Sequence, residues 1–234
     1  MNIALIGYGK MGKAIEEILI ERGHQIPIKL NRNPKAEDLK GIDVAIEFSN
    51  PESAFENIKT LLENNIPTIS GTTGWLEKLD EVKNINQENN CAFLYGSNFS
   101  LGVNLFFELN NYLAKLMNPY AEYKTEIEEI HHTQKLDAPS GTAISLANQI
   151  IECSSLSKWE LDDKSSEENL PIYAKRIDNV PGTHTVSYHS EIDTIEIKHI
   201  AHTRKGFAFG AVLAAEWIKG KQGYFSMKDV LGLN

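Results

Sequence analysis

Along the first part of the chain, apolar residues gather in short runs that predict β-strands. These runs are Asn2–Gly7, Ile26–Leu30, Asp43–Phe48, Ile66–Ser70 and Cys91–Tyr95. Between the first two runs, apolar residues recur with helical spacing over Lys13–Arg22, and Gly23 ends that helix. Asn50 and Pro51 supply an N-cap and a first-turn proline for a helix after the third run. Strands that alternate with helices predict an α/β fold with a parallel sheet.

Further along the chain the periodicity changes. Alternating apolar and polar residues predict strands at Tyr123–Ile130, Ile172–Asp178, Thr183–His189 and Thr194–His199. Helical spacing predicts helices at Val103–Met117, from Ala143 to Ile151, and at Gly206–Lys219. The polar stretch Ser154–Asn169 is expected to be a surface excursion. These elements predict a second α+β domain built on a mixed, mostly open sheet.

Composition narrows the class of protein. The 234 residues can fill a core, and the formal net charge of -9 disfavours a nucleic-acid partner, because phosphate binding needs a basic face. Cys91 and Cys153 are too few for a disulfide framework and indicate a reducing setting. The start, Met1–Ile6, lacks the basic stretch of a signal peptide, and no run reaches the roughly 18 apolar residues that span a bilayer. We expect a cytoplasmic protein without a membrane anchor.

The turn after the first run carries candidate nucleotide chemistry. It reads Gly7-Tyr8-Gly9-Lys10-Met11-Gly12, a G-x-G-x-x-G between a strand and a helix. Glycines permit a tight turn and let the backbone approach a pyrophosphate, while the helix N-terminus offers free N–H groups to the anion. This context favours a dinucleotide site of the Rossmann type over an ordinary βα turn.

The end of the second run bears on the choice of cofactor. A dinucleotide fold usually places there the residue that meets the adenosine ribose, and this chain has Asn31 and Arg32 rather than a carboxylate. Since nothing there repels a 2′-phosphate and Arg32 offers a cation, NADPH should be tolerated. The alternative is that Arg32 is a solvated turn residue.

Two later strand ends carry small polar residues. The loops Gly71-Thr72-Thr73-Gly74 and Gly96-Ser97-Asn98-Phe99-Ser100 follow the fourth and fifth runs. Ligands of open parallel sheets lie at such carboxyl ends, and the glycine, hydroxyl and amide groups suit a nicotinamide ribose and carboxamide. Either loop alone would also be compatible with an ordinary turn.

The segment after Ile130 carries the strongest candidate chemistry. His131, His132 and Lys135 precede a helix whose first residues include Gly141 and Thr142. Cationic side chains and the N–H groups of a helix start together form an anion site. Histidine and lysine can also transfer a proton to a reacting group. The segment therefore predicts both carboxylate binding and acid–base catalysis.

Simpler interpretations of this segment stay open. A histidine pair at a strand end can be structural, and Lys135 can be a surface charge. Four more histidines follow in the same half: His184, His189, His199 and His202. No cysteine or carboxylate completes a ligand set with them at familiar spacing, so we predict no metal.

The residues around this segment resemble a known family. The run Glu129–Ala143, which reads E-I-H-H-T-Q-K-L-D-A-P-S-G-T-A, is similar to the signature loop of the 4-hydroxy-tetrahydrodipicolinate reductases, also called dihydrodipicolinate reductases. Gly7–Gly12, Gly71–Thr73, Asn98–Asn104 and Met227–Leu231 match that family in the same order. The resemblance therefore covers the whole chain.

The resemblance implies an NADH- or NADPH-dependent enzyme that reduces 4-hydroxy-tetrahydrodipicolinate, via dihydrodipicolinate and with loss of water, to tetrahydrodipicolinate. This reaction belongs to diaminopimelate and lysine biosynthesis. By the resemblance, His131 is the catalytic acid/base and Lys135 the proton donor, while His132, Gly141 and Thr142 hold the substrate carboxylates. The implied cofactor contacts are Gly7, Tyr8, Gly9, Lys10, Met11, Gly12, Arg32, Gly71, Thr72, Thr73, Gly96, Ser97, Asn98 and Phe99.

The resemblance also implies a division of the chain. Residues 1–98 plus 204–234 would form the dinucleotide-binding domain, to which the helix Gly206–Lys219 returns. Residues 99–203 would form the substrate-binding domain, through whose sheet a homotetramer assembles. The cofactor is expected between two lobes that can hinge.

Some alternatives within and outside the family remain. Lys10 and Asn31 stand where many members carry arginine and an acidic residue, which leaves the balance of NADH to NADPH open. Whether His131 or Lys135 delivers the proton is also open. An aspartate or homoserine dehydrogenase would share the nucleotide half without the loop from His131 to Thr142, and a nucleotide sensor without turnover would have that loop broken. The intact loop disfavours both.

Overall fold

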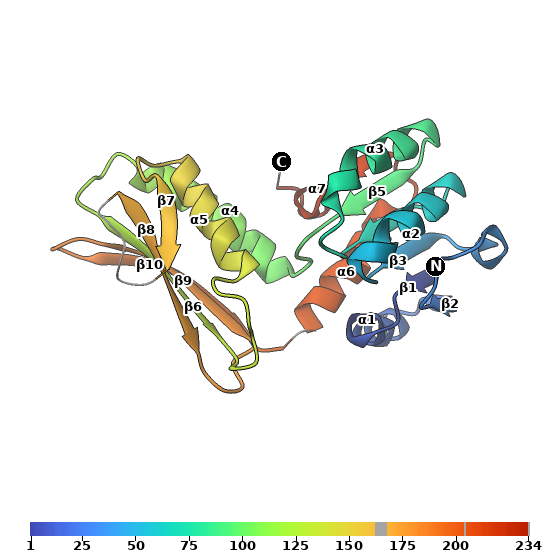
Figure 1. Cartoon of the computed structure of the whole chain (residues 1–234), viewed down its shortest axis with the longest axis horizontal. Helices are drawn as coiled ribbons and strands as arrows, with labels where there is room; N and C mark the ends of the chain where they lie inside the picture. Colours follow the sequence, from blue (N-terminus) through green and yellow to red (C-terminus); the bar gives the residue numbers. More distant parts are fainter. Residues whose placement is uncertain (162–167, 204, 234) are drawn as a thin grey trace. The chain divides into compact units, whose positions relative to one another are not determined.

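The computed structural model describes residues 1–161, 168–203 and 205–233. The chain divides into two compact units (Figure 1). Unit 1 comprises Met1–Leu101 and Lys205–Asn234, and unit 2 comprises Gly102–Arg204. Each unit has its own sheet and its own apolar core.

Unit 1 is built on a parallel sheet of six strands in the order β11-β5-β4-β3-β1-β2. The strands are β1 (Asn2–Ile6), β2 (Gln25–Leu30), β3 (Val44–Glu47), β4 (Thr68–Ser70), β5 (Ala92–Tyr95) and β11 (Gly223–Phe225). The five strands predicted for this half are confirmed with small changes at their ends. β11 was not foreseen, because its three residues are too few for a periodic pattern.

Helices cover both faces of this sheet. They are α1 (Lys10–Glu21), α2 (Pro51–Glu63), α3 (Leu79–Glu88), α6 (Lys205–Ile218) and α7 (Met227–Leu231), with short 3₁₀ turns η1 (Ala36–Leu39) and η2 (Leu76–Lys78). One core cluster packs α1, α6 and α7 against one face of the sheet (Figure 1). Two further clusters contain residues of α2 and α3 together with the intervening strand residues, whose side chains point to the other face. The result is a three-layer α/β unit, as the alternating pattern predicted.

The predicted ends of these helices have clear physical causes. The Asn50 side chain accepts a hydrogen bond from the Ser53 N–H at 3.0 Å, and Pro51 is the first residue of α2. Gly23 follows α1 with φ +76, a conformation that glycine adopts without strain. α1 begins at Lys10 rather than at Lys13, so the second half of the glycine turn is already helical.

Unit 2 is built on a mixed sheet of five strands in the order β10-β9-β6-β8-β7. The strands are β6 (Lys124–His131), β7 (Lys158–Leu161), β8 (Asn169–Arg176), β9 (Gly182–His189) and β10 (Thr194–Ala201). β6 lies in the centre, antiparallel to β9 and parallel to β8. Helices α4 (Leu101–Met117) and α5 (Gly141–Glu152) supply the apolar side chains that pack on one face of the sheet.

One prediction for unit 2 was wrong in part. The stretch Ser154–Asn169 was expected to be a surface excursion, but it contains β7, which pairs with β8. Trp159 and Leu161 pack against the unit 2 core, while their charged neighbours face outward. Four residues with polar flanks are too short a signal for a strand. Residues 162–167 of the stretch lie outside the described residues.

Among the described residues, no helix is both long and apolar enough to cross a lipid bilayer.

Close packing between α6 and the chain around Phe99 gives a test of this fold. A Cβ at Gly210 would lie 1.7 Å from the Phe99 carbonyl oxygen, so Gly210→Ala forces the helix away from the segment that follows β5. We expect the free energy of unfolding to fall by about 1–3 kcal/mol or more. Denaturant unfolding followed by circular dichroism measures the change.

Gly206→Ala in the same helix is the matched control. Its Cβ would meet only the Ser100 hydroxyl oxygen at 3.5 Å, an ordinary contact. Alanine is the better helix former, so we expect no loss of stability. Equal stability of the two variants would contradict the packing described for Gly210.

Candidate active site

The glycine turn of unit 1 has the shape of a nucleotide cradle. Gly7 has φ +90, and a Cβ there would lie 1.9 Å from the Phe48 carbonyl oxygen. A Cβ at Gly12 would lie 2.4 Å from the carbonyl oxygen of Gly7. At Gly9, by contrast, a Cβ would meet nothing within 4 Å. The outer glycines are therefore needed for the turn itself, and the middle one leaves open space beside the backbone.

The start of α1 is suited to an anion. Gly9 is the N-cap residue, and no side chain of the described residues caps it. The first N–H groups of a helix have no partner within the helix, so they can donate to a phosphate. Among the other residues of the turn, Lys10 is exposed, whereas Met11 packs against the core. The turn therefore fits the pyrophosphate of a dinucleotide.

The end of β2 is tied to the glycine turn. The Tyr8 N–H donates to the Asn31 side-chain oxygen at 2.6 Å, and the Tyr8 hydroxyl bonds to Glu16. This bond raises the pKa of Tyr8 and lowers that of Glu16. Asn31 therefore has a structural role in addition to the one predicted near the ribose.

Arg32 is not a free cation. Its guanidinium donates two hydrogen bonds to Asp38, at 2.8 and 2.9 Å, and Asp38 also accepts from the Lys35 N–H at 2.8 Å. The bonds from Arg32 and Lys35 lower the pKa of Asp38 to about 2. Asp38 was not predicted, because no carboxylate stands at the strand end in the sequence and η1 brings this one back from six residues further along.

The polar loop after β4 rests on a buried carboxylate. Glu47 is fully buried at the end of β3 and accepts from the Ser70 hydroxyl at 2.7 Å and the Thr72 hydroxyl at 3.0 Å. It also accepts from the Ser49 N–H at 3.0 Å and from the Ser49 hydroxyl. Burial raises the pKa of Glu47, and these hydrogen bonds oppose that rise. Glu47 was not predicted, although an acid within a buried strand is a signal that the sequence offers.

The predicted cofactor residues of the later loops divide into inward and outward groups. Thr72 is buried on Glu47, and Phe99 is buried with its ring 5.5 Å from that of Phe48. Gly71 and Gly96 each lie against one of these two rings. Thr73 and Ser97 are exposed, and Asn98 is half-buried and accepts from the Ser100 N–H at 2.9 Å. Direct contact with a ligand thus falls to exposed hydroxyls and to the backbone.

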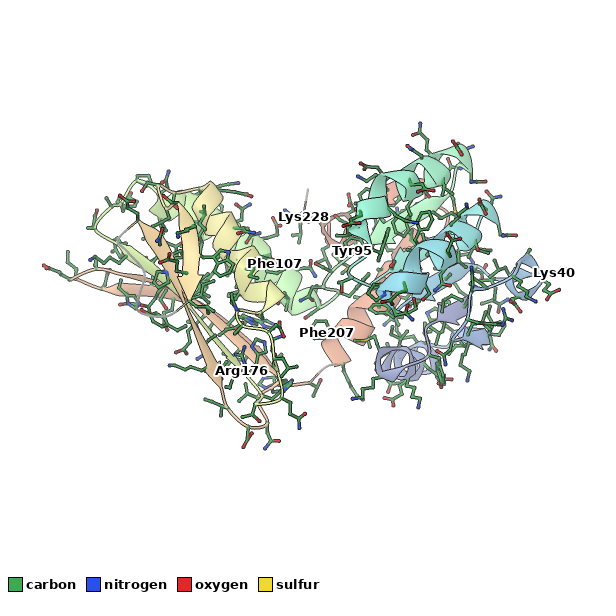
Figure 2. All side chains as sticks on the ribbon, in the orientation of Figure 1. Lys40, Tyr95, Phe107, Arg176, Phe207 and Lys228 are labelled. Atoms are coloured by element: carbon green, nitrogen blue, oxygen red, sulfur yellow. The ribbon has the colours of Figure 1, made fainter. Side chains whose placement is uncertain are left out.

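In unit 2, two polar residues lie on the apolar face of β6. Ile127 is part of the helix-covered core, and alternation along the strand places Glu129 and His131 on the same face. Glu129 pairs across the sheet with His184 of β9, and His131 pairs with Arg176 of β8. All four side chains meet near the carboxyl end of β6; Figure 2 labels Arg176 there.

Glu129 is the centre of this group. It is 0% exposed, and one of its oxygens accepts from both terminal nitrogens of Arg176 at 3.2 Å. The other oxygen accepts from the Ser140 N–H at 2.9 Å. The same oxygen lies 3.6 Å from Nδ1 of His131 and 3.8 Å from Nε2 of His184.

The two buried histidines are held mainly in their neutral form. Burial lowers the pKa of His131, Glu129 opposes this, and the charges of Lys135 and Arg176 lower it further. Burial lowers the pKa of His184 to about 3, with His131 and Lys135 among the other causes. The rings lie 5.0 Å apart, edge to face. Nδ1 of His131 has no hydrogen-bond partner among the described residues.

The loop after His131 is fixed by Arg176. Its guanidinium donates to the Asp137 carbonyl oxygen at 2.6 Å and to the Lys135 carbonyl oxygen at 3.3 Å. The Lys135 ammonium lies 2.7 and 2.8 Å from the two carboxylate oxygens of Asp137. This bond from Lys135 lowers the pKa of Asp137. Leu136, between them, is 97% exposed, so the loop is open to ligands.

The loop ends at the start of α5. Ser140 is the N-cap; its hydroxyl accepts from the Ala143 N–H at 3.2 Å and lies 3.1 Å from Nε2 of His184. Gly141 is exposed, and a Cβ there would meet nothing within 4 Å, while Thr142 is half-buried. His132 is half-buried and lines a cavity of about 290 Å³. The five residues predicted for catalysis and substrate binding thus all belong to one strand end, loop and helix start.

Glu129, His131 and His184 also have ligand atoms within 4.8 Å of one another, a spacing that a metal ion could use. Both oxygens of Glu129 already accept from Arg176 or Ser140, and the positive charges of Lys135 and Arg176 lie nearby. We therefore interpret the group as a hydrogen-bonded cluster. The absence of a metal stays a prediction.

Unit 1 combines a parallel sheet with a glycine turn suited to a dinucleotide, and unit 2 brings two buried histidines and a lysine close to the start of a helix. These features define the class of the nicotinamide-nucleotide-dependent oxidoreductases.

Comparisons with known proteins narrow this class. Residues 1–99 match the family model "Dihydrodipicolinate reductase, N-terminus", and residues 102–231 match "Dihydrodipicolinate reductase, C-terminus". A 4-hydroxy-tetrahydrodipicolinate reductase of Christiangramia forsetii is 56% identical over 234 residues, covering 99% of this chain and 98% of the relative. The chain belongs to the dihydrodipicolinate reductase family, whose members are NAD(P)-dependent oxidoreductases.

Solved structures agree on the fold. A dipicolinate-bound dihydrodipicolinate reductase from Paenisporosarcina sp. TG-14 has a TM-score of 0.76 at 23% identity, covering 97% of each chain. An aspartate dehydrogenase from Thermotoga maritima has a TM-score of 0.51 at 15% identity, covering 92% of this chain and 95% of its own. The fold is thus shared with the rival class considered from the sequence, and the family match excludes that rival.

The neutral state of His184 predicts a pH dependence of stability. Its pKa is lowered from 6.5 to about 3 on folding, so the folded protein resists protonation of this ring. The stability that depends on neutral His184 is present above about pH 6.5 and is lost as the pH falls toward 3. His184→Gln should therefore lose less stability than the wild type over this range, as measured by unfolding midpoints at a series of pH values.

His189→Gln is the control, because this side chain is 39% exposed and belongs to the last residue of the same strand. It should follow the wild-type curve. A His184→Gln curve parallel to that of the wild type would contradict the burial assigned to His184.

Proposed function

We propose that this chain reduces 4-hydroxy-tetrahydrodipicolinate to tetrahydrodipicolinate with NADH or NADPH, in diaminopimelate and lysine biosynthesis. The observation that carries the proposal is the segment from His131 to Thr142, which joins two acid–base side chains to a helix start within one loop. The family match supplies the reaction, and the loop supplies residues suited to it.

The substrate is a small cyclic dicarboxylate, and unit 2 offers groups that bind such an anion. Gly141 is exposed and Thr142 half-buried, and their N–H groups belong to the first turn at the positive end of α5. Lys135 supplies a cation, and His132 can donate a further hydrogen bond. A substrate carboxylate competes with Asp137 for Lys135, so binding exchanges one ion pair for another.

The charge states of the loop residues indicate which side chain delivers the proton. The 4-hydroxyl leaves as water, a hydride adds to the resulting conjugated imine, and the enamine product then takes a proton. At neutral pH a lysine ammonium carries a proton, whereas His131 is held neutral by burial. We therefore assign proton delivery to Lys135 and acid–base exchange to His131. Binding both reactants in register lowers the barrier further, through proximity.

Unit 1 would hold the cofactor. The turn Gly7–Gly12 would take the pyrophosphate, Arg32 would lie near the adenosine ribose, and Gly71–Thr73 and Gly96–Phe99 would approach the nicotinamide half. When bound, the reduced nicotinamide supplies the hydride.

Assembly and location complete the proposal. We infer a homotetramer formed through the sheet of unit 2, in line with the family resemblance. Ile200 of β10 supports it, because this apolar side chain is 50% exposed and alternation places it on the opposite face from Ile197, which packs on the unit 2 core. The free thiols of Cys91 and Cys153 are compatible with the cytoplasm.

Removing the two acid–base groups tests the mechanism. Lys135→Ala and His131→Ala should each lower turnover by about a hundredfold or more, because general-acid catalysis is lost. The binding of NADPH, followed by fluorescence, should persist because unit 1 is unchanged. Substrate is made by condensing pyruvate with aspartate semialdehyde, and oxidation of the reduced nicotinamide is followed by absorbance.

Lys158→Ala is the matched control. Lys158 belongs to the same unit and pairs with Glu160 at 2.8 Å, as Lys135 pairs with Asp137, but it lies on β7. Turnover by the Lys158→Ala variant should equal that of the wild type. Near-normal turnover of both Lys135→Ala and His131→Ala would remove their roles, and no oxidation of either cofactor by the wild type would reject the reaction.

The pairing of Arg32 with Asp38 predicts the cofactor preference. As long as Asp38 accepts both hydrogen bonds, Arg32 is occupied and a 2′-phosphate meets a negative charge. Asp38→Asn removes that charge and frees Arg32, so the KM for NADPH should fall by roughly tenfold while that for NADH changes little. Glu37→Gln, at an exposed neighbour in the same turn, should change neither value. An unchanged ratio of the two KM values in Asp38→Asn would show that Arg32 does not meet the ribose.

A further inference from the structure

Glu129 has no part in the chemistry proposed above, yet it is a fully buried carboxylate around which the candidate site residues of unit 2 gather. Burying a carboxylate costs several kcal/mol unless donors surround it. Such a residue at the end of a strand, next to the proposed acid–base histidine, calls for a physical account.

The contacts of Glu129 join three separate segments. Arg176 comes from β8, and the Ser140 N–H belongs to the residue that starts α5. Because Arg176 also donates to the carbonyl oxygens of Lys135 and Asp137, one carboxylate fixes both the middle and the end of the loop. Loss of its charge would release the donors that set the position of Lys135 and of the Gly141 N–H.

Glu129 also faces the imidazole of His131. The distance from its oxygen to Nδ1 is 3.6 Å, and Nδ1 is buried without another partner among the described residues. A shift of less than 1 Å would close this distance to a hydrogen bond. A carboxylate at Nδ1 favours the tautomer with the proton on Nδ1 and stabilises the ring when it becomes charged.

We propose that Glu129 is a positioning residue of the reaction: through Arg176 and Ser140 it fixes the loop that carries Lys135, and it orients His131. This inference rests on the proposed function of His131 and Lys135. Glu129 itself touches neither substrate nor cofactor in this account. His184 completes the arrangement, since its Nε2 lies 3.1 Å from the Ser140 hydroxyl and 3.8 Å from the Glu129 oxygen that faces His131.

The test is Glu129→Gln, which keeps the size of the side chain and removes its charge. We expect kcat to fall by at least tenfold, while the Kd for NADPH is unchanged. The titratable and charged groups facing His131 are Glu129, Lys135, Arg176, Asp137 and His184. Of the two acids, Glu129 acts more strongly and favours protonated His131, so its loss should move the limb of the kcat–pH profile that belongs to His131 to lower pH.

Glu128→Gln is the matched control. Glu128 is the preceding residue of the same strand, lies on the opposite face and pairs with the exposed Lys175. The Glu128→Gln substitution also removes one carboxylate charge, but neither kcat nor the pH profile should change. A general weakening of the fold in Glu129→Gln would lower the unfolding midpoint without moving the pH limb.

If Glu129→Gln does not fold, Glu129→Asp decides, because it keeps the charge and withdraws it by one methylene group. The proposal is supported if kcat falls by less than the tenfold expected for Glu129→Gln and the limb that belongs to His131 moves to lower pH. Wild-type kcat with an unmoved pH limb, in whichever variant folds, overturns it. If His131→Ala and Lys135→Ala retain turnover, the proposed function fails; if they lose it while the Glu129 variant does not, only this inference fails.

Discussion

The site in unit 2 depends on one constraint: a carboxylate buried on the apolar face of a strand must be surrounded by donors. Glu129 meets this constraint by taking hydrogen bonds from Arg176 and from the Ser140 N–H, which belong to different segments of the chain. The loop between His131 and α5 is positioned as a consequence, because Arg176 also holds its carbonyl oxygens. The burial that makes Glu129 a strong organiser also keeps the two neighbouring histidines neutral.

Unit 1 satisfies the same constraint at the end of β3. Glu47 is as deeply buried as Glu129 and takes hydrogen bonds from Ser49, Ser70 and Thr72, which link the ends of two neighbouring strands. In each unit a fully buried acid at the carboxyl end of a strand thus links the loops that carry the predicted ligand-binding residues. Because loops carry few packing contacts of their own, such buried polar networks are an effective way to hold them in place.

Much of the fold could be predicted from the sequence, and the reasons are local. The apolar runs of unit 1 and the capping residues Asn50 and Pro51 act over a few neighbouring positions, so β1 to β5 and α2 follow from pattern alone. The loop from His131 to Thr142 could be found for the same reason, as its residues are contiguous. β7 and β11 escaped prediction because three or four residues show no period and their pairing partners lie elsewhere in the chain. Asp38, Glu47, Glu129 and Arg176 were missed because their importance lies in contacts across the sheet or turn, although an acid at a core-facing position of an alternating strand was a signal for Glu129.

The central claim is that the segment from His131 to Thr142 holds a dicarboxylate with the help of Lys135. A crystal structure of this chain with NADH and pyridine-2,6-dicarboxylate tests it most directly. The account predicts one carboxylate within hydrogen-bond distance of the Gly141 and Thr142 N–H groups, with the Lys135 ammonium turned from Asp137 to the ligand. A ligand bound elsewhere, with Lys135 still paired to Asp137, would contradict it.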